Sequence, residues 1–152
     1  MADFTTRDLC FGEYFAKTLR PNLPETLFKD ETHLEADLYD AVLARNPRDV
    51  PALKLAGHLY TTIGEYRKGL EADLALCWLC PEEPLVWYNL GCSHALLDQP
   101  DEAFAALDRS VDLGYKELKH ISQDKDLGSL RQDPRYTQLL RRIMASKPRR
   151  KG

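Results

Sequence analysis

The residues best suited to chemistry are cysteines and histidines, and one group of them has the spacing of a metal site. Cys77 and Cys80 form a C-x-x-C pattern, and Cys92 and His94 follow in the next predicted helix. Thiolates and imidazoles at such spacings are typical ligands of structural zinc. Because residues two apart on a helix point in different directions, Cys92 and His94 are poorly placed to share one ion. We therefore predict that these side chains pack in the core and bind no metal.

The other titratable residues match no catalytic motif. The histidines are scattered, and none lies in a nucleophile, zincin or phosphate-loop pattern. They are His33, His58, His94 and His120. We predict a protein that is not an enzyme, with no catalytic residue and no cofactor. The alternative hypothesis is a metal- or redox-dependent regulator that uses Cys77, Cys80 and Cys92.

The composition indicates one soluble helical domain. The 152 residues are 43% hydrophobic and 30% charged, and helix-favouring residues dominate. No apolar run approaches the roughly eighteen residues that a membrane-spanning helix needs. The chain start lacks the basic-then-apolar order of a secretory signal, so we expect a cytoplasmic protein. Four cysteines, including Cys10, are too few for a disulfide framework and are expected to be reduced.

The elements that position these residues follow from an internal repeat of 34 residues. When the chain is shifted by 34, identical residues coincide at positions that shape the helices and turns: Pro47 and Pro81, Gly57 and Gly91, Ala72 and Ala106, Leu79 and Leu113. Residue type is also kept at further positions, among them Leu53 and Trp87. Each unit predicts two amphipathic helices joined by a turn. The predicted helices run from Asp49 to about Thr62, Tyr66 to Leu79, Glu83 to about Leu97, and Pro100 to near Leu113.

These units resemble the tetratricopeptide repeat, whose 34-residue pattern is W-x2-L-G-x2-Y, then A-x3-F, then P. The matching residues are Trp87, Leu90, Gly91 and Ala103 in the second unit, and Gly57, Tyr60 and Pro81 in the first. The resemblance implies an all-α fold, a right-handed solenoid of antiparallel helix pairs. Asp73 departs from it, because the family has a bulky apolar residue there. Either the local packing differs or Asp73 marks a polar contact.

The flanking segments look like incomplete units. Pro21 and Pro24 interrupt the N-terminal part, which is predicted to contain a helix before them and a partial repeat after them. Residues 116–146 resemble the closing segment of bacterial tetratricopeptide arrays, through a string that runs from Asp124 to Tyr136. We therefore divide the chain into N-terminal helices (1–48), two repeat units (49–82 and 83–115), a closing segment (116–146) and a basic tail (147–152).

The resemblance also implies a concave groove, lined by the first helix of each unit, that binds extended peptides. The register places these residues in it: Lys54, His58, Thr61, Tyr88, Asn89, Cys92 and Ala95, continued by Lys119 and Gln123. Tetratricopeptide co-chaperones grip acidic C-termini with a two-carboxylate clamp. At its spacings this chain has Lys54, His58, Asn89, Lys119 and Gln123, of which three match in type. An ordinary solvated groove is the alternative.

We therefore predict a non-catalytic protein–protein interaction module, an adaptor or chaperone-like protein that binds a peptide or helix in this groove. A second copy of the chain is another candidate partner, because small solenoids with open ends often dimerise. Trp78 is a candidate interface anchor; the alternative is that it packs against a neighbouring helix or the N-terminal segment.

The basic C-terminus offers a different partner. The last twelve residues contain six basic residues and no acidic one, so the segment from Arg141 to Lys151 could associate with nucleic acid. No aromatic platform accompanies it and the rest of the chain is acidic, so we expect a solvated terminus and no nucleic-acid partner.

Overall fold

The computed structural model describes residues 25–146, with side-chain surroundings for residues 31–145. The helix predicted before Pro21, Cys10 and the basic tail from residue 147 onward lie outside these residues. Within the described range the chain forms helices and no strand, which confirms the predicted all-α fold.

The helices follow one another with short connections. They are α2 (Glu25–Arg45), α3 (Val50–Thr62), α4 (Tyr66–Leu79), α5 (Pro84–Leu96), α6 (Pro100–Asp112), α7 (Leu118–Gln123), the 3-10 helix η1 (Gly128–Leu130) and α8 (Pro134–Ser146). From α3 to α6 these bounds agree closely with the prediction. The start of each helix in the first pair lies 34 residues before its counterpart in the second pair, so the sequence repeat is also a structural repeat.

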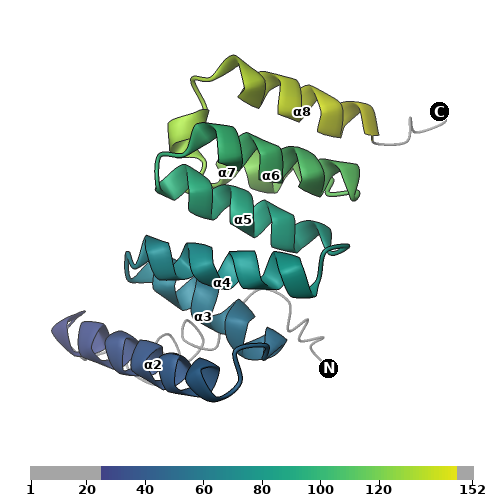
Figure 1. Cartoon of the computed structure of the whole chain (residues 1–152). Coiled ribbons are helices and arrows are strands. Elements are labelled where there is room, and N and C mark those ends of the chain that lie inside the picture. Colours follow the sequence, from purple (N-terminus) through teal and green to yellow (C-terminus); the bar gives the residue numbers. More distant parts are fainter. Residues whose placement is uncertain (1–24, 147–152) are drawn as a thin grey trace, which may run out of the picture.

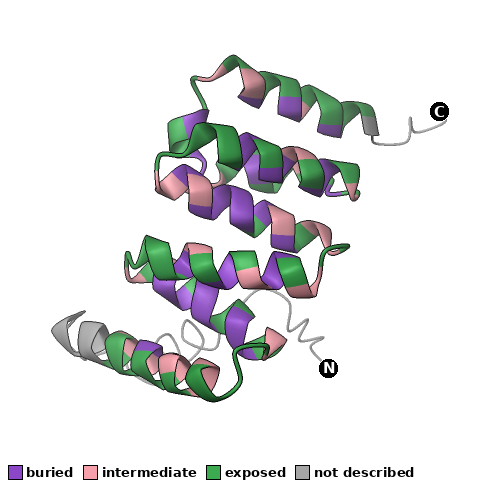
Figure 2. Ribbon diagram, viewed as in Figure 1, coloured by how far each residue is buried: buried purple, intermediate pink, exposed green. Residues whose placement is uncertain are grey.

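The helices stack in chain order as antiparallel neighbours (Figure 1). Helix α3 packs against α2 and α4, α5 packs against α4 and α6, and α8 covers α6. Buried residues lie on the faces that meet between neighbouring helices, whereas the outer faces are exposed (Figure 2). The apolar core is therefore continuous along the stack, as expected when each unit buries its face against the next.

Local signals define where these helices begin. The Asp49 side chain accepts a hydrogen bond from the Ala52 N–H at 3.0 Å and caps the start of α3. Prolines lie in the first turn of α3, α5 and α6, where the missing N–H leaves no hydrogen bond unmade. Helix α8 likewise begins at Pro134, with Asp133 before it as predicted.

The turn inside each unit requires a left-handed backbone. Gly64 has φ of +83° in the first unit, and Asp98, which occupies the same place in the second unit, has φ of +58°. A residue with a Cβ atom is disfavoured in this region, whereas glycine adopts it without steric cost. Asp98 therefore has a backbone conformation that glycine would adopt more easily at this position.

Asp98→Gly is expected to raise the free energy of unfolding by about 0.5 kcal/mol, because it removes that steric cost in the folded state. The reciprocal change Gly64→Asp is the matched variant and is expected to lower it by about as much. Thermal unfolding of both variants beside the parent chain measures the difference. An Asp98→Gly variant less stable than the parent would contradict the prediction.

Asp73, the departure from the repeat pattern, is buried and marks a polar contact. Its side chain is 6% exposed, and its Oδ2 accepts a hydrogen bond from Ser93 Oγ on α5 at 2.5 Å. Burial raises the pKa of Asp73 to about 6, although the hydrogen bond from Ser93 acts in the opposite direction. Helices α4 and α5 are thus joined by a polar pair inside an otherwise apolar contact.

The closing segment ends the stack with its own apolar residues. Ile121, Leu127, Leu130, Leu139 and Ile143 are each at most 1% exposed. Ion pairs fasten α8 to α6 at the surface. Arg142 pairs with Asp108 and Asp112, and Arg135 pairs with Asp101 at 2.7 Å. Apolar burial fixes this segment, and the exposed ion pairs add little to stability.

Candidate peptide-binding groove

The predicted groove consists of corresponding positions on α3 and α5, the first helices of the two units. Lys54, His58 and Thr61 on α3 correspond to Tyr88, Cys92 and Ala95 on α5, each 34 residues later. The surroundings of the two sets differ. In the first unit Lys54 and His58 are exposed and Thr61 is partly exposed. In the second unit all three positions are buried.

Residues 115–130 bury the second set by folding across α5. The Tyr115 ring stacks on the Tyr88 ring, with 4.6 Å between centroids and 10° between planes. The Tyr88 hydroxyl donates a hydrogen bond to Asp124 Oδ2 at 2.5 Å, and the Cys92 thiol lies 3.7 Å from the same oxygen. Farther along, Ser129 Oγ donates to the Ala95 carbonyl at 3.1 Å.

The prediction that Tyr88, Cys92 and Ala95 line an open groove is therefore wrong. Tyr88 is 2% exposed and belongs to the core that the closing segment completes. Burial raises the pKa values of both Tyr88 and Cys92 far above their ordinary range. The register assigns these positions to the inner face, but it cannot show that a later, non-repeating segment covers them.

The first unit keeps its inner face open. Lys54 Nζ lies 2.8 Å from Glu83 Oε1 in an exposed ion pair that joins α3 to the start of α5. Asn89 is the one predicted groove residue of α5 that stays exposed. The Thr61 hydroxyl donates to the Gly57 carbonyl at 3.0 Å within α3. Lys54, His58 and Asn89 are thus all exposed in this part of the molecule.

The closing segment borders this open face. Asp126 is close enough to both His58 and Asp124 for each to influence it electrostatically. Burial and the neighbouring carboxylate raise the pKa of Asp126, whereas His58 lowers it. Lys119 and Gln123 are exposed on α7, the helix of this segment, rather than on a regular first helix. Of the five clamp positions, Lys54, His58 and Asn89 therefore lie on the first helices of the two units, whereas Lys119 and Gln123 lie on the closing segment.

The cysteines do not gather into a site. Within the described residues, no three His, Cys, Asp or Glu side chains are placed to hold a metal ion. Burial raises the pKa of Cys77 to about 12, and its thiol lies 3.7 Å from the Val86 carbonyl. The His94 ring lies 2.8 Å from Gln99 Oε1. Protonated, buried thiols are poor nucleophiles and poor metal ligands.

Two further predicted sites lie elsewhere on the surface. Trp78 on α4 is 69% exposed, with the Arg48 guanidinium 5.0 Å from its ring centroid, so it is not packed into the core. Of the basic C-terminus, Arg141 is exposed and Arg142 is already paired with Asp108 and Asp112. The rest of the basic tail lies beyond the described residues.

The architecture is similar to that of MamA, a protein with tetratricopeptide repeats. A solved structure, the MamA RS-1 ArsTM double mutant, matches with a TM-score of 0.62 over 76% of this chain and 66% of that chain, at 22% sequence identity. The fold is a tetratricopeptide-type helical repeat. Folds of this type are typical of protein-interaction modules and are seldom catalytic.

Sequence comparison adds a similarity over part of the chain. The chain is 28% identical over 90 residues to a chloroplastic protein from Arabidopsis thaliana. The match covers 57% of this chain and 27% of that protein, so the chain spans well under half of this relative. No protein-family model matches the chain. In the part of the chain that the structure describes, each helix is too short or too polar to cross a bilayer.

Proposed function

We propose that this chain is a non-catalytic interaction module that binds an extended, acidic segment of a partner protein on the open inner face of its first unit. The observation that supports this most directly is the contrast between equivalent positions: Lys54 and His58 are exposed where Tyr88 and Cys92 are covered. An adaptor function fits such a face, because it presents a charged side chain and hydrogen-bonding groups to a bound segment.

The covered unit indicates how a segment can dock on the open one. Asp124 of the closing segment lies against Tyr88 and Cys92, the counterparts of Lys54 and His58. An acidic partner residue docked in the same way on the first unit would meet the Lys54 ammonium and the His58 ring. A carboxylate paired with such donors forms hydrogen bonds stronger than neutral ones.

The partner carboxylate must displace Glu83 from Lys54. This exchange costs little, because an ion pair between two exposed side chains contributes only about 0–1 kcal/mol. Both members of the pair are more than one third exposed. Asn89 lies on the neighbouring helix and adds an amide that can donate to, or accept from, the backbone of the bound segment.

Lys54→Glu combined with Asn89→Ala is expected to weaken binding of a fluorescein-labelled acidic peptide by on the order of tenfold, because a charge-assisted hydrogen bond is lost. Fluorescence anisotropy measures the affinity. Arg67→Glu, an exposed charge reversal on α4, is the matched control and should leave the affinity unchanged. Unchanged affinity in the double variant would show that the first-unit face is not the binding surface.

A further inference from the structure

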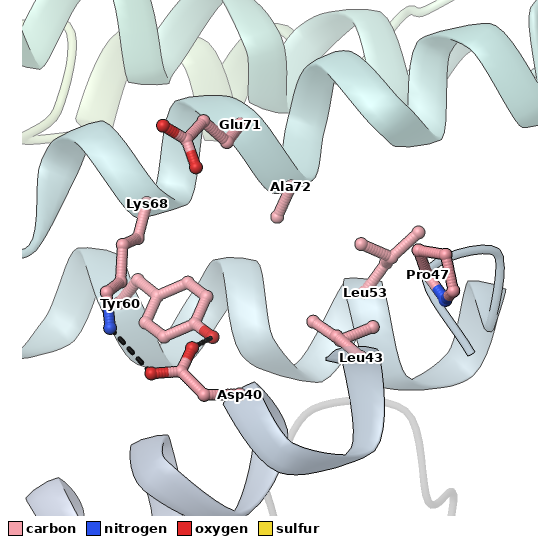
Figure 3. Close-up of a pocket in the computed structure, with 8 residues that line it drawn as sticks. All are labelled: Asp40, Leu43, Pro47, Leu53, Tyr60, Lys68, Glu71 and Ala72. Carbon is pink, nitrogen blue, oxygen red and sulfur yellow. Dashed lines mark hydrogen bonds and ion pairs between the residues drawn. The ribbon is translucent and has the colours of Figure 1, made fainter. Parts of the chain in front are cut away.

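A separate cavity of about 250 Å³ lies between α2 and α4, on the side of the stack formed by the second helices (Figure 3). Its base is apolar and is formed by Leu43, Leu53 and Ala72 from three successive helices. Pro47 closes one end, and polar side chains surround the other. Pockets that hold whole small-molecule ligands begin at about 300 Å³, so this cavity is of the size that receives a single side chain.

The repeat explains why the cavity exists. The counterpart of Leu53 in the second unit is Trp87, which is much larger. The Trp87 indole is partly buried and donates a hydrogen bond from Nε1 to the Pro81 carbonyl at 2.8 Å. Pro47 is the counterpart of Pro81 and lines the cavity. The first unit therefore keeps the proline and the alanine of that environment, as Pro47 and Ala72, but has the smaller Leu53 in place of the Trp.

The acceptor that the indole uses is also available. Among the hydrogen bonds of the described residues, none has the Pro47 carbonyl as its acceptor, whereas Pro81 accepts from Trp87. A planar aromatic group with an N–H donor thus matches both the apolar base and the acceptor at one end. An aliphatic side chain would fill the base and leave that acceptor unused.

The opposite end of the cavity has an excess of negative charge. Asp40 accepts hydrogen bonds from the Tyr60 hydroxyl at 2.5 Å and from Lys68 at 2.6 Å, as the dashed lines in Figure 3 mark. Lys68 holds the pKa of Asp40 below its ordinary value. Glu71 adds a second carboxylate, which makes no ion pair or hydrogen bond within the described residues. A cationic group beside the bound ring would complement Glu71.

We propose that this cavity binds the indole side chain of a tryptophan in a partner protein segment, with a basic residue of that segment next to it. The indole ring packs on Leu43, Leu53 and Ala72, in the position that corresponds to that of Trp87 in the second unit. Its N–H donates to the Pro47 carbonyl, and the neighbouring basic group pairs with Glu71. This site shares helix α3 with the first-unit groove but is lined by other residues of that helix, Leu53 and Tyr60, and the proposal does not depend on the groove.

The full chain is labelled at its Leu and Ala methyl groups. N-acetyl-L-tryptophanamide is then added in increasing amounts while the methyl NMR signals are followed. Saturable shifts are expected at Leu43, Leu53 and Ala72. Leu53→Trp places the chain's own indole in the cavity and should abolish the response, while Lys54→Glu in the groove should leave it unchanged. In the reverse variant, Trp87→Leu, a second response is expected at Ala106, whose counterpart is Ala72.

A second comparison tests whether Glu71 favours a positive charge beside the bound indole. Tryptamine is expected to bind about threefold more tightly than indole-3-acetate, because exposed charge pairs contribute modestly. Glu71→Lys, an exposed substitution that leaves the core intact, should reverse this order. Absence of saturable shifts in the parent chain, or an unchanged response in Leu53→Trp, would overturn the proposal.

A second copy of the chain is the competing occupant, because Trp78 is exposed and has Arg48 beside it. If the same methyl signals shift when the protein concentration is raised without any probe, and Trp78→Ala removes this effect, the partner-segment assignment is wrong. Concentration-independent methyl spectra support it.

Discussion

Asp73→Asn is expected to raise the free energy of unfolding at neutral pH by up to about 3 kcal/mol. In the folded chain Asp73 is buried with one hydrogen-bond donor, Ser93, and burial raises its pKa to about 6 from an ordinary value of 3.8. At neutral pH the folded state must therefore hold a buried carboxylate that the unfolded chain leaves in water. Asparagine has no charge to bury and keeps an amide oxygen that can accept from Ser93.

The contribution of Asp73 to the free energy of unfolding depends on pH. Below about pH 4 the carboxyl is protonated in both the folded and the unfolded chain, and its stabilising contribution is fully present. Between about pH 4 and about pH 6 the folded chain keeps a proton that the unfolded chain has lost, so this contribution falls as pH rises. The advantage of Asp73→Asn should therefore be largest at neutral pH and should vanish in acid.

Urea unfolding of both chains across this pH range measures the difference directly. Asp37→Asn, at an exposed position on α2, is the matched control and should show no such pH-dependent gain. If the free energies of unfolding of Asp73→Asn and the parent differed by the same amount at every pH, ionisation of Asp73 would not destabilise the folded state.

Gly91→Ala is expected to lower the free energy of unfolding by about 2 kcal/mol, whereas Gly57→Ala should leave it unchanged or raise it by up to about 1 kcal/mol. The two glycines occupy the same position in consecutive units. A Cβ atom at Gly91 would lie 2.6 Å from Leu107 Cγ. Leu107 is 1% exposed, so it is surrounded by other core residues, and the same Cβ atom would lie 3.3 Å from the Ala103 carbonyl. A Cβ at Gly57 would meet Asp73 Oδ1 at 3.5 Å, an ordinary contact distance.

Thermal unfolding separates the two variants, with a fall of about 4–8 °C expected for Gly91→Ala. Adding Leu107→Val to Gly91→Ala should restore part of the loss, because the shorter side chain makes room for the new methyl group. Equal effects of the two alanines would show that helix packing is not tighter at the second unit than at the first.

The fold could be predicted from the sequence because its signals are local and occur twice. Asp49, Pro84 and Pro100 define helix starts, and Gly57 and Gly91 occupy matching packing positions, so each unit supports the interpretation of the other. Asp73 stands out as a departure for the same reason. Its partner Ser93 could not be predicted, because that contact depends on how two neighbouring helices are rotated against each other.

The candidate site was harder to predict because its surroundings are not repetitive. The 34-residue register assigns Tyr88 and Cys92 to an open groove, but Tyr115 and Asp124, which cover them, lie in a segment that follows no repeat. A pattern of residue types makes Leu53 and Trp87 equivalent apolar positions. Their difference in volume, which decides whether a cavity forms, is not visible in such a pattern.

The covering of α5 by residues 115–130 also limits how strongly this chain can hold a partner. With one unit left open, a bound segment has less surface to contact than on two open units, and single-site affinity is expected to be weak. Weak sites become effective when two of them engage one ligand, because the second contact then forms at a high local concentration. A partner that reached both the inner face of α3 and the cavity beside Pro47 would gain avidity. The gain would be greatest for a linker just long enough to span the two sites, because a longer linker lowers the local concentration of the second segment.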